Sequence, residues 1–112
     1  MASKRVAKGV PHGPKMNKTE AAYGLTLEAL QRVGRIREYH FQGLTLKLAD
    51  DCRYTPDYFV VRDDWTCELH EVKGFMRDDA LVKLKVCARM YPFVVMLARK
   101  DGVGFRVDPV SP

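Results

Sequence analysis

The sequence lacks any apolar run approaching the roughly 20 residues needed to cross a bilayer, which excludes a membrane-spanning helix. Its three cysteines, Cys52, Cys67 and Cys87, are odd in number and widely spaced, which excludes a disulfide framework and a clustered zinc site. No apolar segment follows the charged N-terminus, which excludes a secretory signal. We therefore expect a soluble protein in a reducing, cytoplasmic compartment.

Acidic residues are also absent from the first 18 positions, so the net charge of +5 comes entirely from this segment, and both signs balance in the rest of the chain. Its cations are Lys4, Arg5, Lys8, Lys15 and Lys18. Interspersed glycines and prolines disfavour helix and strand there. The sequence thus predicts a flexible basic arm, residues 1–16, before one domain, residues 17–112. Such an arm suits phosphate backbones, with a purely solubilising tail as the alternative.

The apolar pattern predicts helix, strands, helix and strands along this domain. Helical spacing of Ala22, Leu25, Ala29 and Val33, widened by Thr26 and Leu30, indicates a helix over residues 18–33, with Asn17 and Glu20 in a capping-box pattern. Alternating or compact apolar segments then predict strands, at 36–42, 44–48, 58–61 and 67–73, separated by a turn at 50–52 and another at 63–64. A second helix over 79–90 precedes strands at 93–97 and 105–107. This order favours an α/β fold, more closely an α+β fold with helices packed on a mixed sheet.

Two short segments carry acids in a pattern that suits phosphodiester hydrolysis. Pro56 and Asp57 open one predicted strand, and Glu71, Val72 and Lys73 end the next. An antiparallel hairpin of this length brings Asp57 close to Glu71, and Lys73 points to the same strand face as Glu71. Mg²⁺ prefers hard oxygen ligands, so these two carboxylates and the Val72 carbonyl are candidate ligands. Such a metal activates water, and the Lys73 ammonium would stabilise the developing negative charge.

These segments resemble the signature of the PD-(D/E)xK nuclease superfamily, which includes restriction enzymes and Holliday-junction resolvases. The predicted element order is similar to its restriction-endonuclease-like αβββαβ core, here with an extra C-terminal strand. Many members place a metal-binding glutamate on the first helix, where Glu20 stands. More narrowly, residues 17–98 resemble small phage-encoded members through three tripeptides, Thr19-Glu20-Ala21, Gly34-Arg35-Ile36 and Val72-Lys73-Gly74.

The resemblance implies a Mg²⁺-dependent endodeoxyribonuclease, with Mn²⁺ as the alternative ion. Its catalytic residues would be Glu20, Asp57, Glu71 and Lys73, with the three acids and the Val72 carbonyl on the metal. It also implies branched DNA such as a Holliday junction as substrate, a homodimer that cuts two strands, and a phage protein in the cytoplasm of a bacterial host. Members often use a basic residue of the second helix near the phosphate, which makes Lys83 and Lys85 DNA-binding candidates beside the cations of the arm.

Each of these residues also has a plain structural explanation. Glu20 could serve only the capping box, Asp57 a turn, and Glu71 with Lys73 an exposed ion pair of little energetic value. Lys83 could pair with Asp79 one turn earlier on the helix. For the whole chain, the alternative is a non-catalytic nucleic-acid-binding or partner-binding protein that retains the nuclease fold. A basic-tailed structural protein with coincidental acids is a third possibility.

Two further residues lead to expectations that a structure can test. Gly24 lies inside the predicted first helix, where glycine costs about 1 kcal/mol relative to alanine. We therefore expect a close approach at Gly24, and a crowded metal cleft would explain it. Trp65 lies in a turn between acids, where it would act either as a packing cap or as a base-stacking contact.

Overall fold

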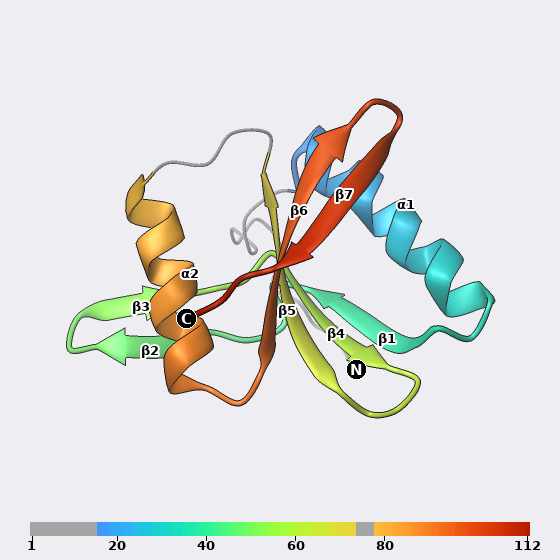
Figure 1. The fold of residues 1–112 in the computed structure, drawn as a ribbon. Helices are drawn as coiled ribbons and strands as arrows, with labels where there is room; N and C mark the ends of the chain where they lie inside the picture. Colours follow the sequence, from blue (N-terminus) through green and yellow to red (C-terminus); the bar gives the residue numbers. More distant parts are fainter. Residues whose placement is uncertain (1–15, 74–77) are drawn as a thin grey trace, which may run out of the picture.

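The structure, a computed structural model, describes residues 16–73 and 78–112 of the chain (Figure 1). The predicted basic arm lies outside the described residues apart from Met16, and so do its Lys4, Arg5, Lys8 and Lys15. The described part is an α+β fold, with elements in the order α1 (Lys18–Arg32), β1 (Ile36–Phe41), β2 (Leu46–Ala49), β3 (Cys52–Tyr54), β4 (Tyr58–Arg62), β5 (Cys67–Lys73), α2 (Asp78–Met90), β6 (Val94–Asp101) and β7 (Gly104–Pro109).

Helix α1 begins with the capping box that the sequence predicts. The Glu20 amide donates to Asn17 Oδ1 at 2.7 Å, and the Asn17 amide donates to Glu20 Oε1 at 2.9 Å. The buried side of the helix differs from the predicted stripe, because Leu25 is 67% exposed while Tyr23 and Leu27 are buried. On this buried side, the Tyr23 hydroxyl lies within hydrogen-bond distance of the buried His70 on the sheet.

The second predicted strand does not join the main sheet. Strand β2 pairs antiparallel with β3, a strand that begins at Cys52, where the sequence indicated only a turn. The turn between them comes at Asp50 and Asp51, and Asp51 adopts a positive φ of 58°. These two strands form a separate hairpin, packed against α2 through Leu48 and the partly buried Tyr54.

The main sheet has the strand order β1-β4-β5-β6-β7. Only the β5–β6 pair is parallel, and the other neighbours are antiparallel. Parallel neighbours need a crossover connection, and α2 lies within the segment that makes it. The sheet is therefore mixed, as predicted, with β5 at its centre.

The two faces of β5 serve different cores, because successive side chains of a strand point to opposite faces. On one face Val72 packs with Tyr23 and Leu27 of α1. On the other face Leu69 packs with Leu84 of α2 and with residues of the β2–β3 hairpin. Figure 1 shows α1 on one side of the sheet, and α2 with the hairpin on the other. Glu71 and Lys73 share the face of Leu69, so they lie on the α2 side.

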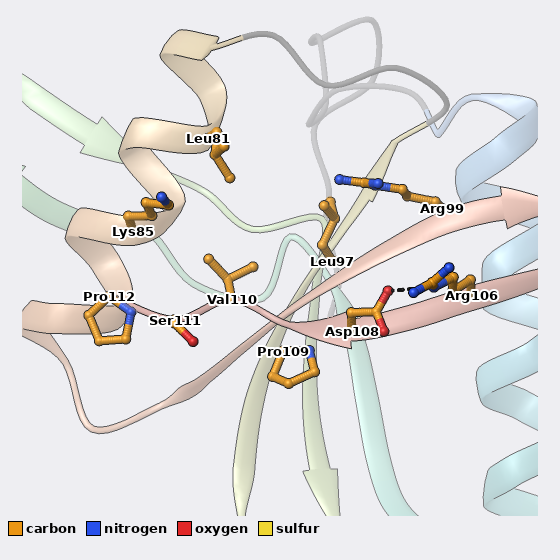
Figure 2. Close-up of a pocket in the computed structure, with 10 residues that line it drawn as sticks. All are labelled: Leu81, Lys85, Leu97, Arg99, Arg106, Asp108, Pro109, Val110, Ser111 and Pro112. Atoms are coloured by element: carbon orange, nitrogen blue, oxygen red, sulfur yellow. Dashed lines mark hydrogen bonds and ion pairs between the residues drawn. The ribbon is translucent and has the colours of Figure 1, made fainter.

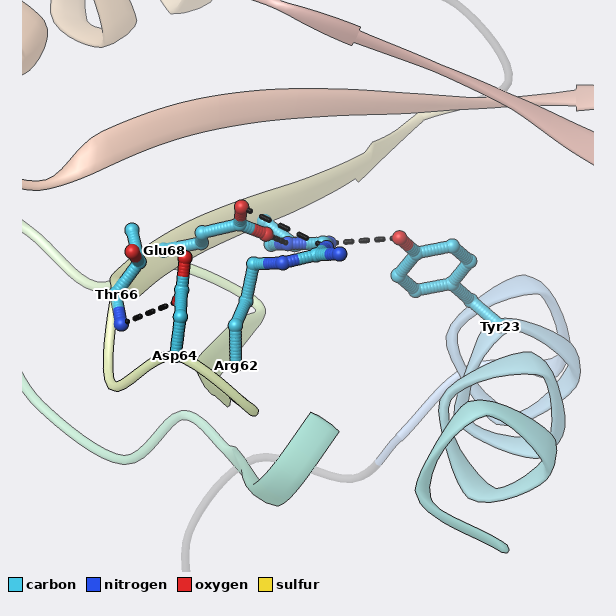
Figure 3. Close-up of polar contacts among 6 residues, drawn as sticks. Tyr23, Arg62, Asp64, Thr66 and Glu68 are labelled. Carbon is cyan, nitrogen blue, oxygen red and sulfur yellow. Dashed lines mark hydrogen bonds and ion pairs between the residues drawn. The ribbon is translucent and has the colours of Figure 1, made fainter. Parts of the chain in front are cut away.

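A buried polar chain joins α1 to the centre of β5 on the α1 face (Figure 3). The Tyr23 hydroxyl lies 2.6 Å from His70 Nδ1, and His70 Nε2 lies 2.8 Å from Glu68 Oε1. Burial, followed by the charge of Glu68, raises the pKa of Tyr23, so the phenol keeps its proton and can donate it to Nδ1. An imidazole protonated at Nε2 then donates to Glu68, and Arg62 approaches the other Glu68 oxygen at 3.8 Å. Each buried polar group of the chain has a partner, as folded proteins require.

We expect the Tyr23→Phe substitution to lower the free energy of unfolding by about 1–3 kcal/mol, because it leaves the buried His70 Nδ1 without a donor. Chemical denaturation at constant pH measures this loss. Tyr39→Phe is the control, because the Tyr39 hydroxyl has no hydrogen-bond partner among residues 16–73 and 78–112. Equal effects of the two substitutions would show that the polar chain contributes nothing specific.

Candidate functional site

Glu71 lies near the C-terminal end of β5 and is only 7% exposed. Both of its carboxylate oxygens are held. The Tyr54 hydroxyl donates to Oε1 at 2.6 Å, and the Lys73 ammonium lies 3.1 Å from Oε2. Glu71 and Lys73 are therefore a partly buried pair on one strand face, and not the freely exposed ion pair that the sequence left open.

Tyr54 is a site residue that the sequence did not indicate. It belongs to β3, a strand expected only as a turn, and the hairpin carries its side chain to the end of β5. Burial, followed by the charge of Glu71, raises the pKa of Tyr54, so its phenol remains a hydrogen-bond donor to the carboxylate. No local pattern could have assigned this role, because the contact depends on how the hairpin packs.

Asp57 lies immediately before β4 and is also only 7% exposed. Its Oδ2 accepts a hydrogen bond from the Val72 amide at 2.8 Å, which holds the start of β4 against the end of β5. The structure thus brings Asp57 beside Glu71, as the hairpin length predicts. Val72 contributes its amide to this contact while its side chain packs in the α1 core; a role for its carbonyl stays a prediction.

Glu20 reaches the same place from the first turn of α1. It completes the capping box, and its carboxyl group is near enough to Asp57 to contribute to the raised pKa of Asp57. The capping explanation is therefore correct, and it does not exclude Glu20 from the cluster. The three acids come from a helix, from the residue before β4 and from β5. Glu20 and Glu71 both lie within electrostatic reach of Asp57.

The carboxylates of this cluster repel one another. Burial, then the charge of Glu71, raises the pKa of Asp57 to about 7, with a further contribution from Glu20 and opposition from the Val72 amide. Partial burial lowers the pKa of Lys73, but the hydrogen bond to Glu71 and the charges of Asp57 and Glu20 outweigh it and raise that pKa. Three carboxyl groups thus face one ammonium group. When all four groups are ionised, the cluster has a net negative charge.

The donor set suits a hard divalent cation in its chemistry, since it offers carboxylate oxygens in a partly buried place. Its arrangement is not that of a finished metal centre. Within residues 16–73 and 78–112, no three His, Cys, Asp or Glu side chains are placed to hold one metal ion together. Glu20 is engaged by Asn17, and Glu71 by Tyr54 and Lys73, so metal binding would require some of these contacts to open.

Gly24 makes the close approach that the sequence predicts, but the cause is a tyrosine rather than a metal. A Cβ at Gly24 would lie 2.7 Å from the hydroxyl oxygen of the buried Tyr58. That hydroxyl donates to the Glu20 backbone carbonyl at 2.6 Å. Gly24 therefore allows Tyr58 to hold the first turn of α1, which positions Glu20.

Three of the basic candidates fall within the described residues. Lys18, Lys83 and Lys85 are all exposed, and Lys85 lines a pocket between α2 and the β6–β7 strands. The side chain of Asp79, the alternative partner of Lys83, lies outside the described residues. Trp65 is exposed in the β4–β5 turn, at the end of these strands away from Asp57, and the Arg37 guanidinium lies 3.9 Å from its ring centroid.

The raised pKa of Asp57 predicts how stability depends on pH. Between the ordinary value of 3.8 and about 7, the folded protein binds a proton at Asp57 that the unfolded chain releases. Stability should therefore fall as pH rises through this window, with the full penalty above pH 7. One pKa unit corresponds to about 1.4 kcal/mol, so the penalty amounts to a few kcal/mol.

Asp57→Asn should therefore be more stable than the wild type at pH 8, and nearly equal to it at pH 4, because an amide oxygen still accepts from Val72. Unfolding free energies measured between pH 4 and pH 8, with a metal chelator present, test this expectation. Asp63→Asn removes an exposed carboxylate of the β4–β5 turn and should leave the slope unchanged. If the unfolding free energy of Asp57→Asn depends on pH as steeply as that of the wild type, the raised pKa does not belong to Asp57.

The contact at Gly24 predicts that the Gly24→Ala substitution changes stability in opposite directions in the wild type and in a Tyr58→Phe variant. Gly24→Ala should destabilise the wild type, because the new methyl group meets the Tyr58 hydroxyl. In a Tyr58→Phe background the nearest atom is the ring carbon at 3.6 Å, and the same change should stabilise by about 1 kcal/mol through helix propensity. A double-mutant cycle by chemical denaturation measures the difference. The same sign in both backgrounds would exclude the contact as the reason for glycine.

No helix in the described residues is long and apolar enough to span a membrane. Comparisons of this chain with protein-family models, with curated proteins and with solved structures find no match. The interpretation of the site therefore depends on its geometry and chemistry.

Proposed function

We propose that this protein is a divalent-metal-dependent DNA endonuclease of the PD-(D/E)xK type, and that Glu20, Asp57, Glu71 and Lys73 form its active site. The observation that carries the proposal is the convergence of three carboxyl groups on one ammonium group. The acids come from segments far apart in the sequence. Burial, then the neighbouring acids, raises the pKa of Asp57, and the acids raise the pKa of Lys73 against the effect of its partial burial. Clusters of this kind, with perturbed pKa values, are concentrated at functional sites.

The acids would hold Mg²⁺, or Mn²⁺ as the alternative, with Asp57 and Glu71 at the centre and Glu20 and the Val72 carbonyl as further ligands. A bound ion of this type polarises a phosphate and lowers the pKa of a coordinated water. The protein's own contribution is orientation. The Val72 amide fixes one oxygen of Asp57, and the Tyr54 hydroxyl fixes one oxygen of Glu71.

Lys73 supplies the positive charge beside the phosphate. Its ammonium stays protonated near neutral pH because the neighbouring carboxylates raise its pKa. Its side chain is 36% exposed, so it can leave Glu71 Oε2 for a phosphate oxygen. Such a cation, placed in advance where negative charge develops, favours the transition state of phosphodiester cleavage.

The order of elements supports the same proposal. Helix α1, strands β1, β4 and β5, helix α2 and strand β6 follow one another in the αβββαβ order, with the β2–β3 hairpin inserted and β7 as the extra C-terminal strand. The substrate, branched DNA such as a Holliday junction, the homodimer, and a phage origin with action in the bacterial cytoplasm belong to the proposal through the sequence resemblance alone.

One observation favours a second candidate, a non-catalytic DNA-binding protein that retains the fold. In the part of the chain that the structure describes, no ready set of three ligands is formed. Lys73 neutralises Glu71, and Asn17 engages Glu20, so these acids already have structural partners. A protein of this kind would bind DNA through its basic side chains and would not cut it.

Cleavage of a Holliday junction, a flap and a linear duplex tests the proposal, with Mg²⁺, Mn²⁺ or a chelator present. We expect cutting only with metal, and a loss on the order of 10²–10³ in rate for Lys73→Met, as for other preorganised charge-stabilising groups. Glu71→Gln should be at least as severe, because it removes a ligand. The matched controls, Lys100→Met and Glu38→Gln, change exposed residues away from the cluster and should cut like the wild type.

Two outcomes contradict the nuclease. If the wild type binds DNA but cuts none of the three substrates with either ion, the non-catalytic candidate is correct. If Glu71→Gln and Lys73→Met cut as fast as their controls, the cleavage arises elsewhere and the active-site assignment is wrong.

A further inference from the structure

A pocket of about 360 Å³ lies between α2, β6, β7 and the residues that follow β7 (Figure 2). Three basic side chains line it from three different elements, Lys85 of α2, Arg99 of β6 and Arg106 of β7, while Asp108 is the single acidic residue among the described residues that line it. Figure 2 shows Arg99 extending from β6 toward Leu81 of α2. The pocket therefore has more positive than negative charge around it.

Arg106 already neutralises Asp108 in this pocket. Arg106 Nε donates to Asp108 Oδ2 at 2.9 Å. Among the side chains that the structure describes, those of residues 16–73 and 80–112, Lys85 and Arg99 have no acidic partner. Positive charge that no described acidic side chain balances attracts anions, so the pocket has the charge of an anion-binding site.

The sheet register places this pocket next to the carboxylate cluster. Lys73 of β5 is the cross-strand partner of Arg99 on β6, and Arg99 is the partner of Arg106 on β7. Cross-strand partners share a sheet face, so the three cations form one row on the α2 side. Neighbouring strands lie about 4.8 Å apart, so the row spans about 10 Å. That length corresponds to about three phosphates of one B-DNA strand along the helix axis.

We propose that the pocket binds the sugar-phosphate backbone of DNA beside the phosphate held at Lys73, with Lys85 and Arg99 as the direct contacts. The inference rests on the proposed function for the identity of the ligand. Arginine suits this role because its planar guanidinium can bind two phosphate oxygens at once. A polymer is favoured over a free anion because the row of cations continues from the pocket to the carboxylate cluster. Arg106 stays paired with Asp108 and sets the edge of the pocket.

Binding of the full-length protein to a fluorescent duplex and a Holliday junction tests this inference, by anisotropy in a metal chelator so that no cutting occurs. Arg99→Gln and Lys85→Gln should each weaken binding about tenfold, as expected for the loss of one charged hydrogen bond. Each should also reduce the slope of log affinity against log salt by about 0.9. Thermal unfolding confirms that each variant is folded.

Lys100→Gln is the matched control, because Lys100 adjoins Arg99 on β6 but points to the opposite face, where its ammonium lies over Phe105. If the pocket variants weaken binding no more than this control, only overall charge matters and the inference is wrong. A second arm titrates inorganic phosphate and follows it by NMR shifts around the pocket. If phosphate binding depends on Arg99 and Lys85 but DNA affinity does not, the pocket binds small anions and the DNA assignment is overturned.

The two proposals fail separately. Loss of DNA affinity in the pocket variants supports this inference even if the wild type proves unable to cut. Conversely, a wild type that cuts DNA with metal, together with pocket variants that bind and cut normally, overturns this inference and leaves the nuclease intact.

Discussion

The hydrogen bond from the Val72 amide to Asp57 Oδ2 is the contact on which the site depends. It joins the residue before β4 to the end of β5 and is buried at both ends. Because an amide hydrogen bond favours the ionised carboxylate, it also opposes the rise in the pKa of Asp57 caused by burial and by Glu71. It therefore offsets part of the cost of placing Asp57 beside a second buried acid.

Helix α1 belongs both to the core and to the site. Tyr23 attaches it to the centre of β5 through His70, and the Tyr58 hydroxyl holds its first turn through the Glu20 carbonyl. These two contacts hold the helix that carries Glu20, and the Asn17 amide holds the Glu20 carboxyl itself. A rigid support of this kind is what a functional site needs, because a small misplacement of a charged group weakens its action strongly.

Strand β5 separates two charge arrangements. On the α1 face, Glu68 and His70 complete a buried chain in which each polar group has a partner. On the α2 face, Glu71 remains in a cluster with an excess of acid, next to a row of cations that continues onto β6 and β7. The first arrangement is satisfied within the protein. The second places negative and positive charge side by side without full compensation, which is what binding of both a metal ion and a phosphate backbone would require.

Local sequence patterns were sufficient to predict those contacts that join residues close in the sequence. The capping box of Asn17 and Glu20 was predictable because its partners are three residues apart, and the approach of Asp57 to Glu71 followed from the length of one hairpin. The separate β2–β3 hairpin was not predictable, because its strands are short and their place depends on packing against α2. The predicted apolar stripe of α1 was correct only in part. Leu30 packs against the core, but Leu25 and Val33 are exposed, and Tyr23 and Leu27 are the residues that are buried.

The sequence by itself thus determined most of the elements and their order, and it singled out the acids and the lysine of the proposed site. Only the tertiary structure decided that Tyr54 holds Glu71, that Tyr58 requires a glycine at position 24, and that Arg99 stands between Lys73 and Arg106. The physical reason is that these contacts join segments whose relative position is set by strand register and by packing of the whole fold, which no local pattern of residues encodes.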